Sequence, residues 1–238
     1  MLNRDAIEKI EEMAKNEVIE CNGFDYSTKQ LFRIEPPAIQ PLNFKSIKGV
    51  CDVIKKEYEK HKTPLIVVAD EDSIDVYTHI ENRKRDLLYT SVSNAPYHDF
   101  GRYITREEMC IKLKSIYIQT EERDNVIKLI SSISNSHITT QNDDGFSQSV
   151  EVAKGISFKE MINVDSIITL KPYRTFNEVE QPESKFLLRF KEYSNNIGVA
   201  LFEADGGAWK LDAKNNIMAK LCEELEELIK NNKVIVTI

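Results

Sequence analysis

Two groups of acidic side chains in the C-terminal half of the chain come closest to hydrolytic chemistry in their types and spacing. Asp143 and Asp144 are adjacent, and Glu203 and Asp205 follow an apolar stretch. Carboxylates can hold a divalent metal ion that activates water against a phosphodiester. The other interpretation is that acidic residues beside Gly and Pro form turns and cap helices. The acidic set also contains Glu178, Glu180 and Glu183.

The histidines and cysteines carry no known catalytic or metal-binding signature. No histidine stands at the H-x-H or H-x-x-x-H spacing of zinc sites, and no C-x-x-C pair, P-loop or G-x-S-x-G motif occurs. The run 137–139, His-Ile-Thr, resembles half of the motif pair of two-histidine phosphoesterases. The second half is absent, because His79-Ile80-Glu81 has glutamate in place of the hydroxyl residue. We therefore assign no catalytic residue, metal or cofactor.

Arg174 is the strongest candidate for a buried or interface arginine. It stands between Tyr173 and Phe176, whose rings can stack on a guanidinium, and the acidic run 178–183 can supply a carboxylate partner. Its other possible role is to tie the turn at Pro172 to the hairpin that follows. The residues that we predict for binding or interface contact are Tyr173, Arg174, Phe176, Glu180, Glu203, Asp205 and Trp209.

A hairpin and a helix must position these residues. Strand-like runs at 185–190 and 198–202 flank a connection rich in Asn and Gly, which is typical of an antiparallel pair. Asp205-Gly206-Gly207 permits the positive φ of a sharp turn. The apolar stripe from Asp212 to Asn231 predicts a long helix, and 234–238 predicts a paired terminal strand.

The rest of the chain alternates helical and strand patterns. Helices are predicted over 5–18, from Ser46, from a capping box at Thr105 and Glu108, and from Thr120. Strands are predicted around 30–34, at 65–69 as a strand buried on both faces, at 73–80 and 86–92, and three times between 137 and 170. We expect an α+β fold with a mixed region at 1–135 and a β-rich region at 136–238, which either form two domains or share one core.

Composition narrows the class of protein. The chain has 238 residues, 41% of them hydrophobic, and a formal net charge of -7. No apolar run reaches the roughly 20 residues of a membrane helix, and no signal peptide stands at the start, so a cytoplasmic location is expected. The negative charge disfavours binding of nucleic acid through overall charge.

Three stretches carry a family resemblance: Asp143-Asp144-Gly145, the block Leu170–Glu192 (LKPYRTFNEVEQPESKFLLRFKE) and the block Ala200–Leu211 (ALFEADGGAWKL). Together they resemble the YfdQ-like group of phage and prophage proteins. The resemblance covers the C-terminal half well, the helical pair near 104–133 loosely, and the first hundred residues only in layout. It implies a protein made from a mobile element in a bacterial cytoplasm, and it implies no activity.

These observations favour a phage or prophage protein that acts without catalysis, by binding or self-assembly. The distinctive residues are aromatic, Arg and Pro, which build interfaces more often than they perform chemistry. The apolar terminal strand can add to the sheet of a second copy, so self-association is expected, and a host or phage protein is the other partner considered. One alternative is a metal-dependent enzyme or nucleic-acid accessory acting on phosphodiesters. Another is a counter-defence protein that sequesters a host factor or nucleotide signal.

Overall fold

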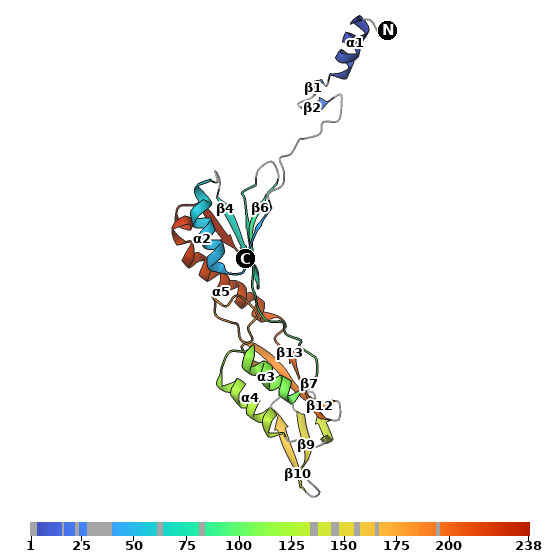
Figure 1. The fold of residues 1–238 in the computed structure, drawn as a ribbon, viewed down its shortest axis with the longest axis vertical. Helices are drawn as coiled ribbons and strands as arrows, with labels where there is room; N and C mark the ends of the chain where they lie inside the picture. The colour runs from blue at the N-terminus through green and yellow to red at the C-terminus, as the bar shows by residue number, and fades with distance from the viewer. Residues whose placement is uncertain are drawn as a thin grey trace. The chain divides into compact units, whose positions relative to one another are not determined.

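The computed structural model divides the chain into two compact units, residues 1–38 and 39–238, and each is described by itself (Figure 1). Within the described part of the chain, every helix is too short or too polar to cross a bilayer. The residues that the structure describes are 4–15, 17–21, 24–27, 40–60, 64–80, 84–133, 138–143, 148–154, 158–164, 167–193 and 196–238.

The described residues of the first unit form a helix and an antiparallel strand pair. Helix α1 (Arg4–Ala14) is followed by the antiparallel strands β1 (Val18–Cys21) and β2 (Phe24–Ser27). The helix is shorter than the predicted 5–18, because the β-branched residues at its expected end start β1 instead. The strand predicted around 30–34 lies outside the described residues.

A five-stranded mixed sheet forms one half of the second unit, in the order β14-β4-β5-β6-β3. The three central strands run antiparallel, while β14 is parallel to β4 and β3 is parallel to β6. The terminal strand predicted from its apolar residues is therefore paired. The bounds are β3 (Leu42–Phe44), β4 (Leu65–Ala69), β5 (Ser73–Tyr77), β6 (Leu87–Val92) and β14 (Val234–Thr237).

Helices cover one face of this sheet. Helix α2 (Ile47–Glu57) begins at Ser46, whose hydroxyl accepts from the backbone amide of Gly49. It packs with α5 (Ala208–Glu224) on the same side of the sheet, and the short helix α6 (Glu226–Lys230) follows (Figure 1). In β4 only alternate side chains are buried, so this strand faces a core on one side and not on both as predicted.

A four-stranded antiparallel sheet forms the other half of this unit, in the order β11-β12-β13-β7. Its centre is the predicted hairpin, in which Phe186 pairs with Glu203 and Phe190 with Val199. Helices α3 and α4 pack on this sheet. As predicted, a capping box begins α3 and Thr120 caps the start of α4. The bounds are β7 (Ile104–Thr105), α3 (Arg106–Ser115), α4 (Glu121–Ser132), β11 (Ile167–Leu170), β12 (Ser184–Tyr193) and β13 (Asn196–Glu203).

Between α4 and β11 the chain forms a separate antiparallel sheet in the order β10-β9-β8. Its strands match the predicted strand-rich texture after residue 136. They are β8 (Ile138–Asp143), β9 (Gln148–Lys154) and β10 (Phe158–Val164).

Helices and strands together confirm the predicted α+β class. Residue 135, the expected end of the mixed region, lies inside the second unit, and the division into compact units follows Ala38. Helix α5 and strand β14 complete the sheet of β4 to β6 and bury its apolar face. Residues of the C-terminal helices and strand therefore pack in the same core as those of α2 and β4 to β6.

Candidate ligand-binding pocket

The segment between β11 and β12 is held in shape by one buried glutamine. Gln181 is only 2% exposed. Its Oε1 accepts hydrogen bonds from the backbone amides of Arg174 (2.9 Å) and Thr175 (3.2 Å). Its Nε2 donates to the carbonyls of Phe176 (2.9 Å) and Val179 (3.3 Å). Four backbone groups of a segment without regular structure are thereby satisfied, and the direction of the Arg174 side chain is set.

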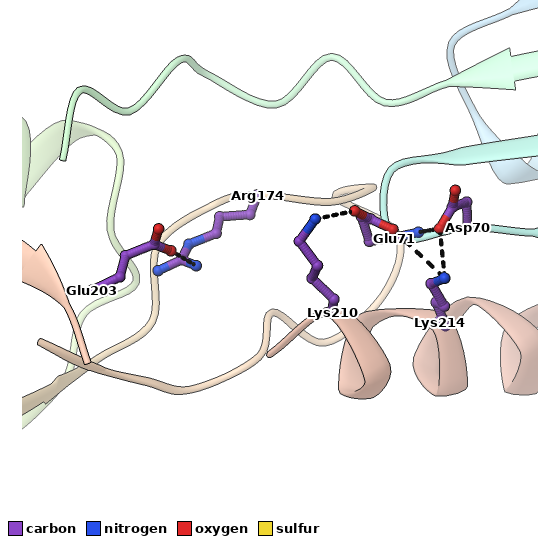
Figure 2. A network of polar contacts seen from close by, with 6 residues as sticks. All are labelled: Asp70, Glu71, Arg174, Glu203, Lys210 and Lys214. Carbon is purple, nitrogen blue, oxygen red and sulfur yellow. Dashed lines mark hydrogen bonds and ion pairs between the residues drawn. The ribbon is translucent and has the colours of Figure 1, made fainter. Parts of the chain in front are cut away.

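The guanidinium of Arg174 lies among three aromatic rings. Its central carbon is 4.9 Å from the ring centroid of Phe100, 5.1 Å from that of Phe186 and 4.6 Å from that of Trp209. Nη1 donates to Oε1 of Glu203 at 2.8 Å, at the end of β13 (Figure 2). Each ring face attracts the cation, and the ion pair neutralises it.

Burial lowers the pKa of the Arg174 guanidinium, while the charges of Glu203 and Asp205 raise it in part. The side chain is 5% exposed. Its Nε and Nη2 are covered from solvent and have no hydrogen-bond partner among the described residues. The remaining donors of this arginine therefore lie behind the surface, and the rings provide most of their environment.

Asp205 holds the start of α5. Its Oδ1 accepts from the amide of Gly207 at 3.0 Å, and the positive φ of Gly206 and Gly207 turns the chain into the helix as predicted. Burial alone raises the pKa of Asp205, but the hydrogen bond from Gly207 and the charge of Arg174 outweigh it and lower the pKa. The carboxylate is therefore ionised at neutral pH and places Trp209 in the first turn of α5.

The turn between β4 and β5 is tied to α5 by ion pairs. Lys210 Nζ lies 2.6 Å from Oε1 of Glu71, and Lys214 Nζ lies 2.8 Å from Oδ1 of Asp70 (Figure 2). The next residue, Asp72, accepts from the backbone amide of Ser93 through its carbonyl at 2.8 Å. The backbone hydrogen bond fixes the position of the Asp72 backbone, and the ion pairs occupy both lysines.

His98 is fixed as a neutral imidazole. Its Nε2 lies 2.9 Å from the carbonyl oxygen of Tyr173, and a carbonyl can only accept, so Nε2 carries the proton. Its ring stacks on Phe100 with a centroid distance of 5.2 Å. Burial lowers the pKa of His98, and the charges of Arg174 and Lys112 lower it further. His98 therefore adds no positive charge at neutral pH.

Side chains from these segments line an open pocket of about 440 Å³, here called the Trp209 pocket. Tyr97 stands at its rim and is 86% exposed. A ring so open to solvent contributes nothing to a core, which is the usual place for a large aromatic side chain. The lining residues are Asp72, Ser93, Ala95, Pro96, Tyr97, His98, Phe100, Arg174, Glu203 and Trp209.

The structure brings some of the predicted binding residues together and separates others. Arg174, Glu203 and Trp209 line the Trp209 pocket, and Asp205 lies next to them as the cap of α5. The prediction that Tyr173 and Phe176 stack on Arg174 is wrong. The rings that contact its guanidinium are those of Phe100, Phe186 and Trp209.

The two neighbouring aromatic residues have other positions. Phe176 is 1% exposed and belongs to the core under the five-stranded sheet. Tyr173 is fixed by its backbone, whose amide donates to the carbonyl of Ile116 at 3.0 Å. Glu180 points to solvent and pairs with Lys171 at 3.2 Å. Because Phe176 is packed in this core, its ring cannot also cover the guanidinium of Arg174.

The other acidic candidates have structural partners. Glu178 accepts through both carboxylate oxygens from the amides of Ile47 (2.9 Å) and Lys48 (3.0 Å), and so caps α2 from far along the chain. Glu183 lies 3.4 Å from Lys171. Asp143 ends β8, and Asp144 lies outside the described residues. Across the described ranges, no three His, Cys, Asp or Glu residues lie close enough to hold a metal ion.

Sequence reasoning missed most of the pocket lining, including Asp72, Tyr97 and His98. The loop that carries two of them, 94–101, combines three aromatic or imidazole rings with proline in a connection between strands. Such a ring-rich loop is a signal for a binding surface, since ordinary loops are polar. Asp72 gave no signal, because it stands in an acidic turn.

Comparison with known proteins adds no relative to this description. No protein-family model, no curated protein and no solved structure matches the chain. The resemblance to phage proteins therefore stays a prediction.

Proposed function

We propose that this protein acts by binding, without catalysis, and that its ligand occupies the Trp209 pocket. The observation that carries the proposal is the make-up of the pocket walls, in which Tyr97 and Trp209 stand beside the ion pair of Arg174 and Glu203. Small-molecule sites are concave, typically about 300 to 1,000 Å³, and combine aromatic walls with a few fixed polar groups. The volume of about 440 Å³ is in this range.

The phosphodiesterase alternative is less well supported, because its candidate carboxylates already have structural roles. Glu203 is paired with Arg174, and Asp205 caps α5. A phage origin and the capture of a host factor or nucleotide signal are both compatible with a binding pocket, and they stay predictions. Incubation with DNA, RNA and cyclic nucleotides, with Mg²⁺ or Mn²⁺, should give no product; turnover that Asp205→Asn abolishes would favour the enzyme.

The fluorescence of Trp209 tests the proposed binding directly, because it is the only tryptophan in the chain. We expect at least one class from a panel of amines, amino acids, nucleotides, sugars and carboxylates to change the emission in a saturable way. Tyr97→Ala should weaken that change, whereas Tyr26→Ala, which alters an exposed tyrosine of the first unit, should not. A flat response to every class in the panel would overturn the proposal.

We also propose that two copies associate through β14. This strand ends the five-stranded sheet, so one of its edges has no neighbouring strand in the described part of the chain. Val234 and Val236 face the helices, while Ile235 is 48% exposed on the other face. Antiparallel pairing with Ile235 opposite its own copy keeps every side chain on its proper face, which a register shifted by one residue does not.

Light scattering tests this association. We expect a mass of twice the 27.4 kDa of one chain, and Ile235→Lys should shift it to one chain by placing two like charges opposite each other. Ile111→Lys, at a comparably exposed isoleucine on α3, should leave the mass unchanged. A wild-type protein with the mass of a single chain contradicts the proposal.

A further inference from the structure

The charged side chains that line the Trp209 pocket favour a positive ligand. Two carboxylates, Asp72 and Glu203, stand against the single guanidinium of Arg174, so the formal charge of the lining is negative. Glu203 meets Arg174 through Oε1 only, and its side chain is 44% exposed, which leaves Oε2 free to accept from a ligand. Asp72 has no ion-pair partner among the described residues.

The donors that could attract an anion are either covered or occupied. Nε and Nη2 of Arg174 are unpaired but buried, and the rings of Phe100, Phe186 and Trp209 pack around them. Lys210 and Lys214, the nearest lysines on α5, are engaged by Glu71 and Asp70.

The aromatic walls add an attraction that is specific for cations. An aromatic ring face carries partial negative charge, and a cation within about 6 Å of it is held more strongly when a pocket excludes water. Tyr97 is almost fully exposed at the rim, so its ring is open to a ligand. The Trp209 ring already attracts cations, because its centroid lies 4.6 Å from the guanidinium carbon of Arg174 and 5.9 Å from Nζ of Lys210.

We propose that the Trp209 pocket binds an organic cation, an ammonium or guanidinium group, between Tyr97 and Trp209 and against the carboxylates of Asp72 and Glu203. The inference rests on the proposed function and adds the chemical class of the ligand. Such a cation is either a small amine or the side chain of a lysine or arginine in a peptide, and both present the same group to the pocket.

Titration of Trp209 fluorescence with matched pairs of probes tests the charge. Methylguanidinium is compared with methylurea, and butylammonium with butanol, because each pair differs mainly in charge. We expect saturable changes with the two cations and none with the neutral probes, acetate or phosphate, at constant ionic strength. A capped tripeptide with a central arginine binding more tightly than methylguanidinium would identify a peptide side chain as the source, and weaker binding a small amine.

Substitutions then assign the effect to the pocket. Asp72→Asn should weaken cation binding about tenfold without loss of stability, because the Asp72 carboxylate has no described partner to lose. Asp212→Asn removes the same charge from the exposed side of α5 and should leave binding unchanged. Glu203→Gln should also weaken binding, and a thermal melt checks that Arg174 remains buried in that variant.

Two results would overturn the inference. One is a response to acetate or phosphate in the absence of a response to cations, which would mean that Arg174 opens to an anion. The other is an equal loss in Asp72→Asn and Asp212→Asn, which would mean that only overall charge matters. In either case the proposed function survives if some class in the wider panel still changes Trp209 emission and Tyr97→Ala weakens that change. A panel without any effect removes both.

Discussion

Phe176→Ala should lower the free energy of unfolding by about 3 to 5 kcal/mol, the usual cost of removing a fully buried phenylalanine ring. The ring is 1% exposed and packs among residues of α2, α5 and the five-stranded sheet. It comes from the segment that carries Arg174, so the substitution also loosens the link between the two halves of this unit. Chemical denaturation followed by circular dichroism measures the change.

Tyr97→Ala is the matched comparison for that substitution. Its ring is 86% exposed, so its removal should change stability by no more than about 0.5 kcal/mol while weakening ligand binding. The two variants should therefore separate a core aromatic residue from a pocket aromatic residue. If Phe176→Ala were as stable as the wild type and lost binding instead, the ring would belong to the pocket after all.

Local sequence signals were enough to predict most helices and strands. The capping box at Thr105 and Glu108 is present with both of its hydrogen bonds, and Ser46 and Thr120 cap α2 and α4. The Asp-Gly-Gly turn before α5 has the expected positive φ. These signals succeed because capping and turn formation depend on residues within one turn of the chain.

The pairing of distant segments could not be predicted in this way. β14 aligns parallel to β4 across the whole second unit, and Glu178 caps a helix that begins at Ile47. Nothing in the local pattern of either segment identifies its partner, because any apolar strand could fill the edge of the sheet and any carboxylate could cap the helix.

The candidate site was predicted in its centre and missed in its surroundings. The composition around Arg174 indicated a stacked, paired arginine, and the structure has one, but its carboxylate partner is Glu203 and not a residue of the predicted run 178–183. The stacking rings come from three other segments, and one of these, the loop 94–101 with Phe100, also carries the rim residue Tyr97. A pocket assembled from loops that are far apart in the sequence is visible only after the sheets have formed.

Gln181→Leu should be among the most damaging single substitutions in the chain. It preserves the size of the side chain but leaves two amides and two carbonyls of the buried segment without their partners. Each unsatisfied buried group costs about 1 to 3 kcal/mol of folding free energy. Because the four groups belong to one segment, their costs are not additive, and we expect a total loss of about 3 to 6 kcal/mol. Gln119→Leu, at an exposed glutamine, should cost less than about 1 kcal/mol.

Gln181→Glu tests the role of the hydrogen bonds that Gln181 donates separately from the role of those that it accepts. A carboxylate still accepts from the amides of Arg174 and Thr175, but it faces the carbonyl of Phe176 with an oxygen instead of an N–H group. That repulsion and the burial should raise the pKa of the new glutamate in the folded state, so the folded variant holds a proton more tightly than the unfolded chain. Its stability relative to Gln181→Leu should therefore be greatest below the unfolded pKa of about 4.3 and decline as the pH rises through the folded value. Denaturation of both variants across this range measures the difference, and parallel pH profiles would mean that Gln181 does not donate to the segment that presents Arg174.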